Sequence, residues 1–336
     1  MNIRVKTYLL LVIFAAGLIA CSKDVTVASE PEDIDWSSAS ELSFDIGKEQ
    51  IRVSRVTETP YNTSDYYLPN DDSIGVSVKN APYSMGSYSY SNVKYVSSGV
   101  GSAQTWSNPT STLIALKKDS AHVSAYHPYH KDTDPLAIPM NCLNGIDYLY
   151  APYRAWTSSG RLYWADPHAH IKLKHAQAII IFSYEWNGYP GAGVLTQTQV
   201  SGGAFGMQGI LNSTTGAVTS ISGSYGRMYG TPKNLPTTTT PSPEYLDSIY
   251  VIPTGSVVGK VKFTLTIDGT DFKAESPIKE LKPGYIYYFP LKNRGKSNEL
   301  EIGEVTIKPW NTQLIPQYGI VDDYCYIMAG IPIPGT

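Results

Sequence analysis

Histidines are the residues of this chain whose type and spacing come closest to a catalytic or metal site. His122, His127 and His130 lie close together, and His168 and His170 stand one residue apart. On a β-strand this second spacing would put two imidazoles on one face, a geometry that zinc sites use. However, no carboxylate stands at the spacing of the zinc-binding helix of metalloproteases. We therefore expect no bound metal and interpret these histidines as packed or solvated side chains.

Other catalytic motifs are missing from the sequence. It contains no Gly-x-Ser-x-Gly elbow, no phosphate-binding loop and no dinucleotide fingerprint. A Ser/His/Asp triad assembled from distant positions would have no local signature, and nothing in the chain suggests one. We predict that the protein is not an enzyme and that it needs no cofactor.

Aromatic side chains could bind a sugar. The Tyr-rich stretch from Tyr83 to Tyr95, together with Trp106 and Trp156, could stack on pyranose rings, as in a surface protein that binds glycans. The simpler interpretation is that these residues belong to strands and keep one end in water. Both interpretations stay open at the level of the sequence.

The composition predicts many short strands and turns. The 336-residue chain contains 26 Tyr but only 7 Phe, with 28 Gly and 23 Pro, and charged residues make up only 16%. This length suffices for two domains with separate cores. The net charge of -3 and the lack of a basic run argue against binding to nucleic acid. We expect an all-β protein of two domains.

The amino-terminal segment is typical of a targeting signal. Arg4 and Lys6 precede the apolar residues 8–17, and the following Leu-Ile-Ala-Cys matches the lipobox of bacterial lipoproteins, in which Cys21 carries the lipid. Residues 1–21 are therefore predicted to be a lipoprotein signal peptide. The alternative is an ordinary secretory signal with a chance cysteine, and export follows in either case.

A half-buried strand is predicted soon after this signal. Residues 22–40 are polar and acidic and are typical of a flexible tether. Leu42, Phe44 and Ile46 then alternate with polar residues, which is the pattern of a strand with one apolar face.

Two arginines follow this strand in a segment that we expect to be extended. Arg52 and Arg55 are either ordinary surface charges or a processing site for an arginine-directed protease. Cleavage there would detach the first strand from the rest of the chain.

The middle of the chain is predicted to form strands separated by turns, as in a β-sandwich. The continuous apolar run at residues 178–182 indicates a strand that is buried on both faces. We predict a first domain at residues 41–174 and a second domain at residues 175–317.

The carboxy-terminal segment at residues 318–336 has strand character but no hairpin partner after it. Apart from Asp323, alternate positions form an apolar face made of Val321, Cys325, Ile327, Ala329, Ile331 and Ile333. This strand either folds back onto its own domain or adds to a sheet of another molecule. A disulfide between Cys142 and Cys325 is permitted in an oxidising compartment, but we favour Cys325 as a small buried apolar residue.

The order of these features resembles the fimbrillins of Bacteroidales, which are subunits of type V pili. The resemblance rests on the lipobox at Cys21, the linker with Arg52 and Arg55, and the motifs at residues 72–76, 123–129, 148–151, 175–178, 281–287 and 307–310. Together these pieces cover most of the chain.

The resemblance implies two transthyretin-like sandwiches in tandem and a maturation pathway. The protein would begin as an outer-membrane lipoprotein, and an arginine-specific protease would cut after Arg55 or Arg52 and remove the strand at residues 42–51. The tail of an identical or related subunit would then fill the vacated groove, which gives a head-to-tail fimbria at the cell surface. A host ligand is a further implied partner.

An alternative within the same resemblance is a permanently lipid-anchored surface protein, either a pilus anchor or a glycan-binding lipoprotein. In that case Cys21 keeps its lipid in the mature protein. The long segment after Trp310 argues against a tip subunit, which would lack a free donor strand.

Overall fold

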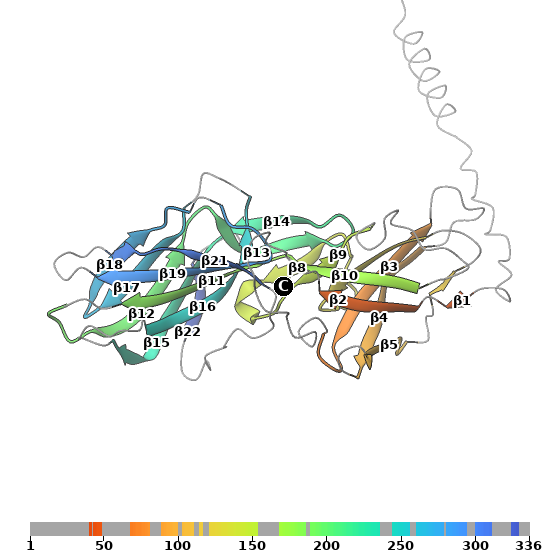
Figure 1. Ribbon diagram of the computed structural model, residues 1–336, viewed down its shortest axis with the longest axis horizontal. Coiled ribbons are helices and arrows are strands. Elements are labelled where there is room, and N and C mark those ends of the chain that lie inside the picture. The colour runs from red at the N-terminus through yellow and green to blue at the C-terminus, as the bar shows by residue number, and fades with distance from the viewer. Residues whose placement is uncertain are drawn as a thin grey trace, which may run out of the picture.

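The computed structural model of the protein describes residues 40–41, 43–48, 68–80, 89–99, 103–110, 114–116, 121–153, 168–185, 189–235, 244–255, 260–278, 280–293, 300–310 and 324–328. These residues form strands and one short 3-10 helix, η4 (Cys142–Asn144), which confirms the prediction of an all-β protein. No helix in this part of the chain is long and apolar enough to cross a membrane. The strands gather in two lobes that lie end to end (Figure 1).

The amino-terminal lobe contains a seven-stranded sheet. Its strands are in the order β2-β10-β9-β7-β3-β4-β5, and only the pair β2 and β10 is parallel. The bounds are β2 (Ser43–Lys48), β3 (Ser73–Asn80), β4 (Ser89–Ser98), β5 (Thr105–Ser107), β7 (Ala121–His127), β9 (Leu149–Ala151) and β10 (His168–His175). A short separate pair joins β1 (Ser40–Glu41) to β6 (Ala115–Leu116).

Alternating apolar residues build the core of this lobe. Ile74, Val76 and Val78 of β3 are almost completely buried, and alternate residues of β7 and β10 join the same cluster. Because successive side chains of a strand point to opposite faces, this spacing of two gives each strand one apolar side.

The carboxy-terminal lobe consists of two sheets. An eight-stranded sheet has the order β14-β13-β16-β11-β19-β20, with β21 also paired to β19 and β8 to β13, and an antiparallel five-stranded sheet has the order β18-β17-β12-β15-β22. The first sheet comprises β8 (Ile138–Asn141), β11 (Ala178–Glu185), β13 (Phe205–Asn212), β14 (Ala217–Ser222), β16 (Glu244–Pro253), β19 (Tyr285–Asn293), β20 (Leu300–Ile302) and β21 (Thr306–Pro309). The second comprises β12 (Val194–Ser201), β15 (Ser224–Asn234), β17 (Lys262–Ile267), β18 (Thr270–Glu275) and β22 (Tyr324–Met328).

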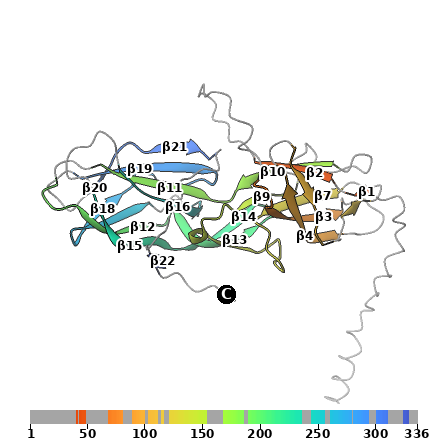
Figure 2. The ribbon, with the colours of Figure 1, turned by 90° about the horizontal axis from the view of Figure 1, so that it is seen from below.

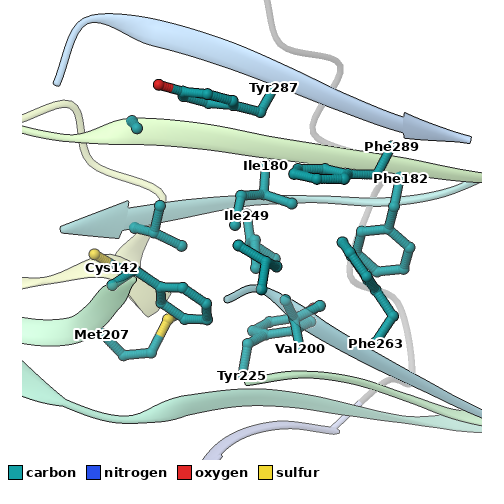
Figure 3. Close-up of a cluster of buried hydrophobic side chains, with 14 of the residues drawn as sticks. Cys142, Ile180, Phe182, Val200, Met207, Tyr225, Ile249, Phe263, Tyr287 and Phe289 are labelled. Carbon is teal, nitrogen blue, oxygen red and sulfur yellow. The ribbon is translucent and has the colours of Figure 1, made fainter. Parts of the chain in front are cut away.

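The inner faces of these two sheets share one apolar core (Figure 3). Phe263 of the five-stranded sheet packs between Phe182 and Phe289 of the other sheet, with ring centroids 5.5 and 5.0 Å apart. Strand β11 is buried along almost its whole length, on both faces, as its apolar run predicts. This arrangement is a sandwich in which β11 is a central strand.

One segment of the first half of the chain belongs to the second lobe. After β7 the chain crosses over, and β8 pairs antiparallel with β13 before the chain returns to the first lobe at β9. Ile138 and Met140 of β8 are buried in the larger core. The lobes therefore interlock in sequence, and the division near residue 174 remains a prediction for the main boundary only.

The direct connection between the lobes is very short. Only Ala176 and Gln177 separate β10 from β11, and Gln177 is fully buried. Its side-chain oxygen accepts a hydrogen bond from the backbone N–H of Tyr148 at 3.0 Å, and its carbonyl accepts one from Gly284 at 2.7 Å. Gln177 thus ties together backbone segments from both halves of the chain.

This role predicts a loss of stability in the variant Gln177→Ala. The variant leaves the buried N–H of Tyr148 without its partner, which should cost about 1 to 3 kcal/mol in the free energy of unfolding. Chemical denaturation measures this loss. The half-buried Gln208 serves as the matched control, because Gln208→Ala should change stability by less than about 0.5 kcal/mol. Equal losses in the two variants would contradict the proposed role of the Gln177 amide.

Candidate functional site: the two terminal edge strands

The first candidate element is the edge strand β2. It pairs in parallel with β10, and among the described residues it has no second hydrogen-bonded neighbour. Ile46 lies opposite Ile171 and is only 2% exposed. Of the other residues predicted for this removable strand, Phe44 is described by its backbone, which lies opposite Ala169, and Leu42 is outside the described residues.

Strand β2 completes the edge of the first sheet. Ala169, Ile171 and Leu173 of β10 belong to the same buried cluster as Ile46. Burial of one Ile or Leu side chain is worth about 1.5 to 3 kcal/mol, so loss of β2 would remove the burial of Ile46 and expose part of β10 to water. It would also leave the N–H and C=O groups of β10 without strand partners on that side.

The second candidate element is β22 in the carboxy-terminal tail. It pairs antiparallel with β15 at the edge of the five-stranded sheet, where Cys325 lies opposite Arg227 and Ile327 opposite Tyr225 (Figure 2). The described part of the tail therefore adopts the first of the two options that the sequence leaves open, pairing with its own domain. Val321, Ala329, Ile331 and Ile333 of the predicted apolar face lie outside the described residues.

A buried ion pair lies beside the backbone that receives β22. Arg227 on β15 is 3.1 Å from Asp247 on β16, and both residues are less than 10% exposed. Tyr225 donates its hydroxyl hydrogen to the Asp247 carboxylate at 2.5 Å, and the N–H of Ser248 donates at 2.8 Å. Burial raises the pKa of Asp247 above its usual value, whereas Arg227 and these hydrogen bonds act in the opposite direction.

This ion pair has no signal in the amino-acid sequence. Its members belong to different sheets, and no local motif connects them. The pair links β15 of the five-stranded sheet to β16 of the eight-stranded sheet.

The described histidines pack inside the structure. Both ring nitrogens of His127 are engaged, by Asp72 at 2.9 Å and by the carbonyl of Asp147 at 3.1 Å. His175 bonds to the Asp147 carboxylate at 2.8 Å and stacks on Trp310 with centroids 3.9 Å apart.

Two further histidines are also packed against other side chains or buried. His122 is 5% exposed, and His130 stacks on Tyr148. The side chains of His168 and His170 are outside the described residues. Within the described ranges, no group of three or more His, Cys, Asp or Glu side chains could hold a metal ion.

The described candidate sugar-binding aromatics of the first lobe pack in or against its core. Tyr95 is 2% exposed, and Tyr90 and Trp106 pack against the smaller apolar cluster. Tyr83 and Trp156 lie outside the described residues. The described members of this set therefore do not form an open stacking surface.

The cysteines and arginines of the predicted maturation pathway are only partly described. Cys142 is a free, buried thiol, and burial raises its pKa to about 12. It lies beside the Gln177 amide, 3.3 Å from its nitrogen, and packs as an apolar residue. Cys21, Arg52 and Arg55 lie outside the described residues, so lipidation and cleavage stay predictions.

Comparison with known proteins identifies the family. The model of the fimbrillin-like family matches residues 54–310, which is more than half of the chain, so the protein belongs to this family. The family is one of structural proteins. Membership supports a role of the pilin type, association with other fimbrial subunits and a location at the cell surface.

Solved structures agree with the fold. A protein of Bacteroides uniformis ATCC 8492, provisionally described as a cell adhesion protein, is 13% identical with a TM-score of 0.51 and covers 80% of this chain and 98% of its own. A similarly described protein of Bacteroides ovatus ATCC 8483 is 18% identical with a TM-score of 0.52, over 80% and 96% of the two chains. The fimbrial anchor protein Mfa2 of Porphyromonas gingivalis is 10% identical with a TM-score of 0.38, over 81% and 98% of the two chains. No curated protein matches the chain.

The buried ion pair predicts a pH-dependent effect for Arg227→Met. Without Arg227, the pKa of the Asp247 carboxyl should rise further above its unfolded value. A carboxyl with a raised pKa in the folded state favours folding when protonated, and it loses this contribution as the pH rises through the folded pKa. The variant should therefore lose about 3 to 5 kcal/mol at pH 8 and less at pH 5, as measured by denaturation against the wild type.

The double variant Arg227→Met with Asp247→Asn is the control, because it removes both charges. Its loss of stability relative to the wild type should depend on pH much less than that of Arg227→Met. If the single variant loses the same free energy at both pH values, Asp247 does not carry the uncompensated charge.

Proposed function

We propose that the protein is a pilin, a structural subunit of a type V fimbria that polymerises by donor-strand exchange. The chain is exported as a lipoprotein through Cys21 and is cut after Arg55 or Arg52. Cleavage releases the segment at residues 42–51, and the tail of a neighbouring subunit at residues 318–336 replaces it. The mature fimbria supports adhesion at the cell surface.

The observation that carries this proposal is the position of the two terminal strands. Strands β2 and β22 each pair with one neighbour among the described residues, and each lies at the end of its sheet. An edge strand can leave without opening a ladder in the interior of a sheet, whereas a central strand such as β11 cannot. Strands β2 and β22 lie near the two ends of the chain, and their exchange would therefore leave the rest of the fold intact.

The energetics favour replacement over an empty groove. The alternate apolar residues of the tail would contribute about 8 to 15 kcal/mol of gross burial in such a groove. This is comparable with the whole net stability of a typical domain, about 5 to 15 kcal/mol. Because the donor leaves one subunit and enters the next, the contact is heterologous and does not close, so its repetition builds a filament.

A second candidate function is a permanently lipid-anchored surface protein of the same family. The pairing of β22 with β15 of its own chain favours this candidate, since a tail that stays in its own sheet is not available as a donor. In the pilin proposal the same pairing is a resting position that the tail leaves during assembly. The two candidates differ in the amino terminus of the mature protein and in the fate of β22.

Sequencing of the amino terminus of mature protein from cells tests the processing step. The pilin proposal expects a start at Val56, or at Val53 if Arg52 is cut. The variant Arg55→Ala with Arg52→Ala should retain Cys21 and remain unpolymerised. A lipidated Cys21 as the amino terminus of the wild-type mature protein would instead support the anchored surface protein.

Tethering of β22 to β15 tests the exchange step. Met228 lies opposite Tyr324 in the register, and the Met228 side chain is 51% exposed. Directly opposite residues of antiparallel strands have Cα atoms about 4.5 to 5.5 Å apart, a separation that a disulfide spans. Met228→Cys with Tyr324→Cys, in a Cys325→Ser background, should block polymerisation when oxidised and restore it after reduction. Electron microscopy and gel filtration of the processed protein measure this.

The Cys325→Ser variant alone is the control and should polymerise under both conditions. Polymerisation of the oxidised, tethered variant at the wild-type rate would exclude this tail as the donor. A variant that lacks residues 318–336 provides a second check, because the monomer should stay folded but fail to assemble.

A further inference from the structure

The outer face of the eight-stranded sheet carries a hollow of about 340 Å³. It faces away from the shared core, and it spans β16, β11, β19 and β21, which are neighbours in this sheet. Its lining consists of Ile181, Ser183, Tyr245, Tyr288, Phe289, Pro290, Glu304, Thr306 and Lys308.

The register of the strands arranges these side chains in rows. Ser183 on β11 lies between Tyr245 on β16 and Pro290 on β19. In the next row Ile181 lies opposite Tyr288, which in turn pairs with Thr306 on β21. Since residues two apart on a strand share a face, the central strand supplies an apolar floor at Ile181 and a hydroxyl at Ser183.

Tyrosines provide the aromatic walls of the hollow. Tyr245 is 49% exposed, and Tyr288 is half-buried with the Lys308 ammonium 5.7 Å from its ring centroid. Burial and the nearby Tyr245 raise the pKa of the Tyr288 hydroxyl, so it keeps its proton and can donate a hydrogen bond at neutral pH. Both rings are thus partly accessible and close to polar groups.

The charges of the lining balance. Glu304 supplies one negative charge and Lys308 one positive charge, and Ser183 and Thr306 add neutral hydroxyls. Such a set offers both donors and acceptors, but it has no excess of positive charge that would attract an anion. The floor residues already have strand neighbours on both sides, so an added strand would find no free backbone edge there.

We propose that this hollow binds a neutral saccharide. A pyranose ring presents an apolar face of C–H groups, which packs on an aromatic ring, and a rim of hydroxyls, which needs donors and acceptors of both kinds. The hollow supplies both next to one another, and its volume is at the lower end of the range for small-ligand sites, which suits one or two sugar units. This site does not depend on the proposed polymerisation, because its residues lie apart from β2 and β22.

A second hollow, of about 560 Å³, lacks these properties. It lies beside β17 and β18, where Glu275 is paired with Lys260 and Lys262, and Lys273 with Asp271. The aromatic residue in its lining, Phe263, is 1% exposed. Size alone therefore does not select the saccharide site; the combination of exposed rings and available polar groups does.

Binding of the purified full chain to an array of neutral oligosaccharides tests the proposal, with calorimetry on the glycan that binds best. Tyr288→Ala should weaken that binding about ten-fold or more, and Lys308→Met about three-fold or more. Tyr288→Phe keeps the ring and should retain affinity within about three-fold. Thermal denaturation checks that each variant is folded, and the surface substitution at Lys308 keeps the test decisive if Tyr288→Ala does not fold.

Tyr129→Ala is the matched control. Tyr129 lies in the first lobe beneath Lys94, whose ammonium is 5.5 Å from the ring centroid, so it is a similar cation–π pair away from the hollow. This variant should bind like the wild type. Failure of all neutral glycans to bind overturns the proposal, and so does an equal loss of affinity in Tyr129→Ala and Tyr288→Ala. Because the test uses unpolymerised protein, its failure is distinct from a failure of the pilin proposal.

Discussion

A strand at the edge of a sheet has hydrogen-bonded neighbours on one side only. The proposed assembly of this protein depends on which parts of the sequence form such edge strands. Strand β2 lies near the amino terminus and β22 near the carboxyl terminus, and each forms one edge ladder among the described residues. Removal of either strand would break the hydrogen bonds to one neighbouring strand and expose one apolar face. Removal of a central strand would instead separate two neighbouring strands and open the core. In the proposed assembly, the segments that exchange are therefore the edge strands near the two ends of the chain.

The interior strands could not be exchanged in this way, because segments from the two halves of the chain are interlocked. The crossing strand β8 belongs to the sheet of the second lobe although its sequence lies within the first half of the chain. The Gln177 amide joins this crossing to the short connection between β10 and β11, and Asp147 bonds to His127 through its carbonyl and to His175 through its carboxylate. Histidines that could suggest chemistry thus serve as structural links. In the proposed pilin, these links would hold the body of the subunit together while its terminal strands exchange.

Assembly and ligand binding would use different parts of the sheets. Strand exchange would use the backbone N–H and C=O groups at the edges of the sheets. The side chains of an exchanged strand would matter mainly because every second one must be apolar and buried. The proposed saccharide site uses the outer face of a sheet whose backbone is already paired, so its specificity comes from the side chains of Tyr245, Tyr288 and Lys308. A subunit built in this way could present a ligand-binding face along a filament without interference between the two functions.

The local features of the fold follow from short stretches of sequence. The alternation around Ile46 predicts a half-buried strand, the apolar run at residues 178–182 predicts a strand buried on both faces, and the composition predicts an all-β protein. These features depend on side-chain periodicity, which a short window of sequence contains. Four other features emerge only from the folded chain: the parallel pairing of β2 with β10, the crossing of β8, the contact of Arg227 with Asp247 and the hollow beside Tyr288. Each of these joins residues distant in sequence, and many pairings of strands bury the same apolar faces, so no local pattern distinguishes the one that forms.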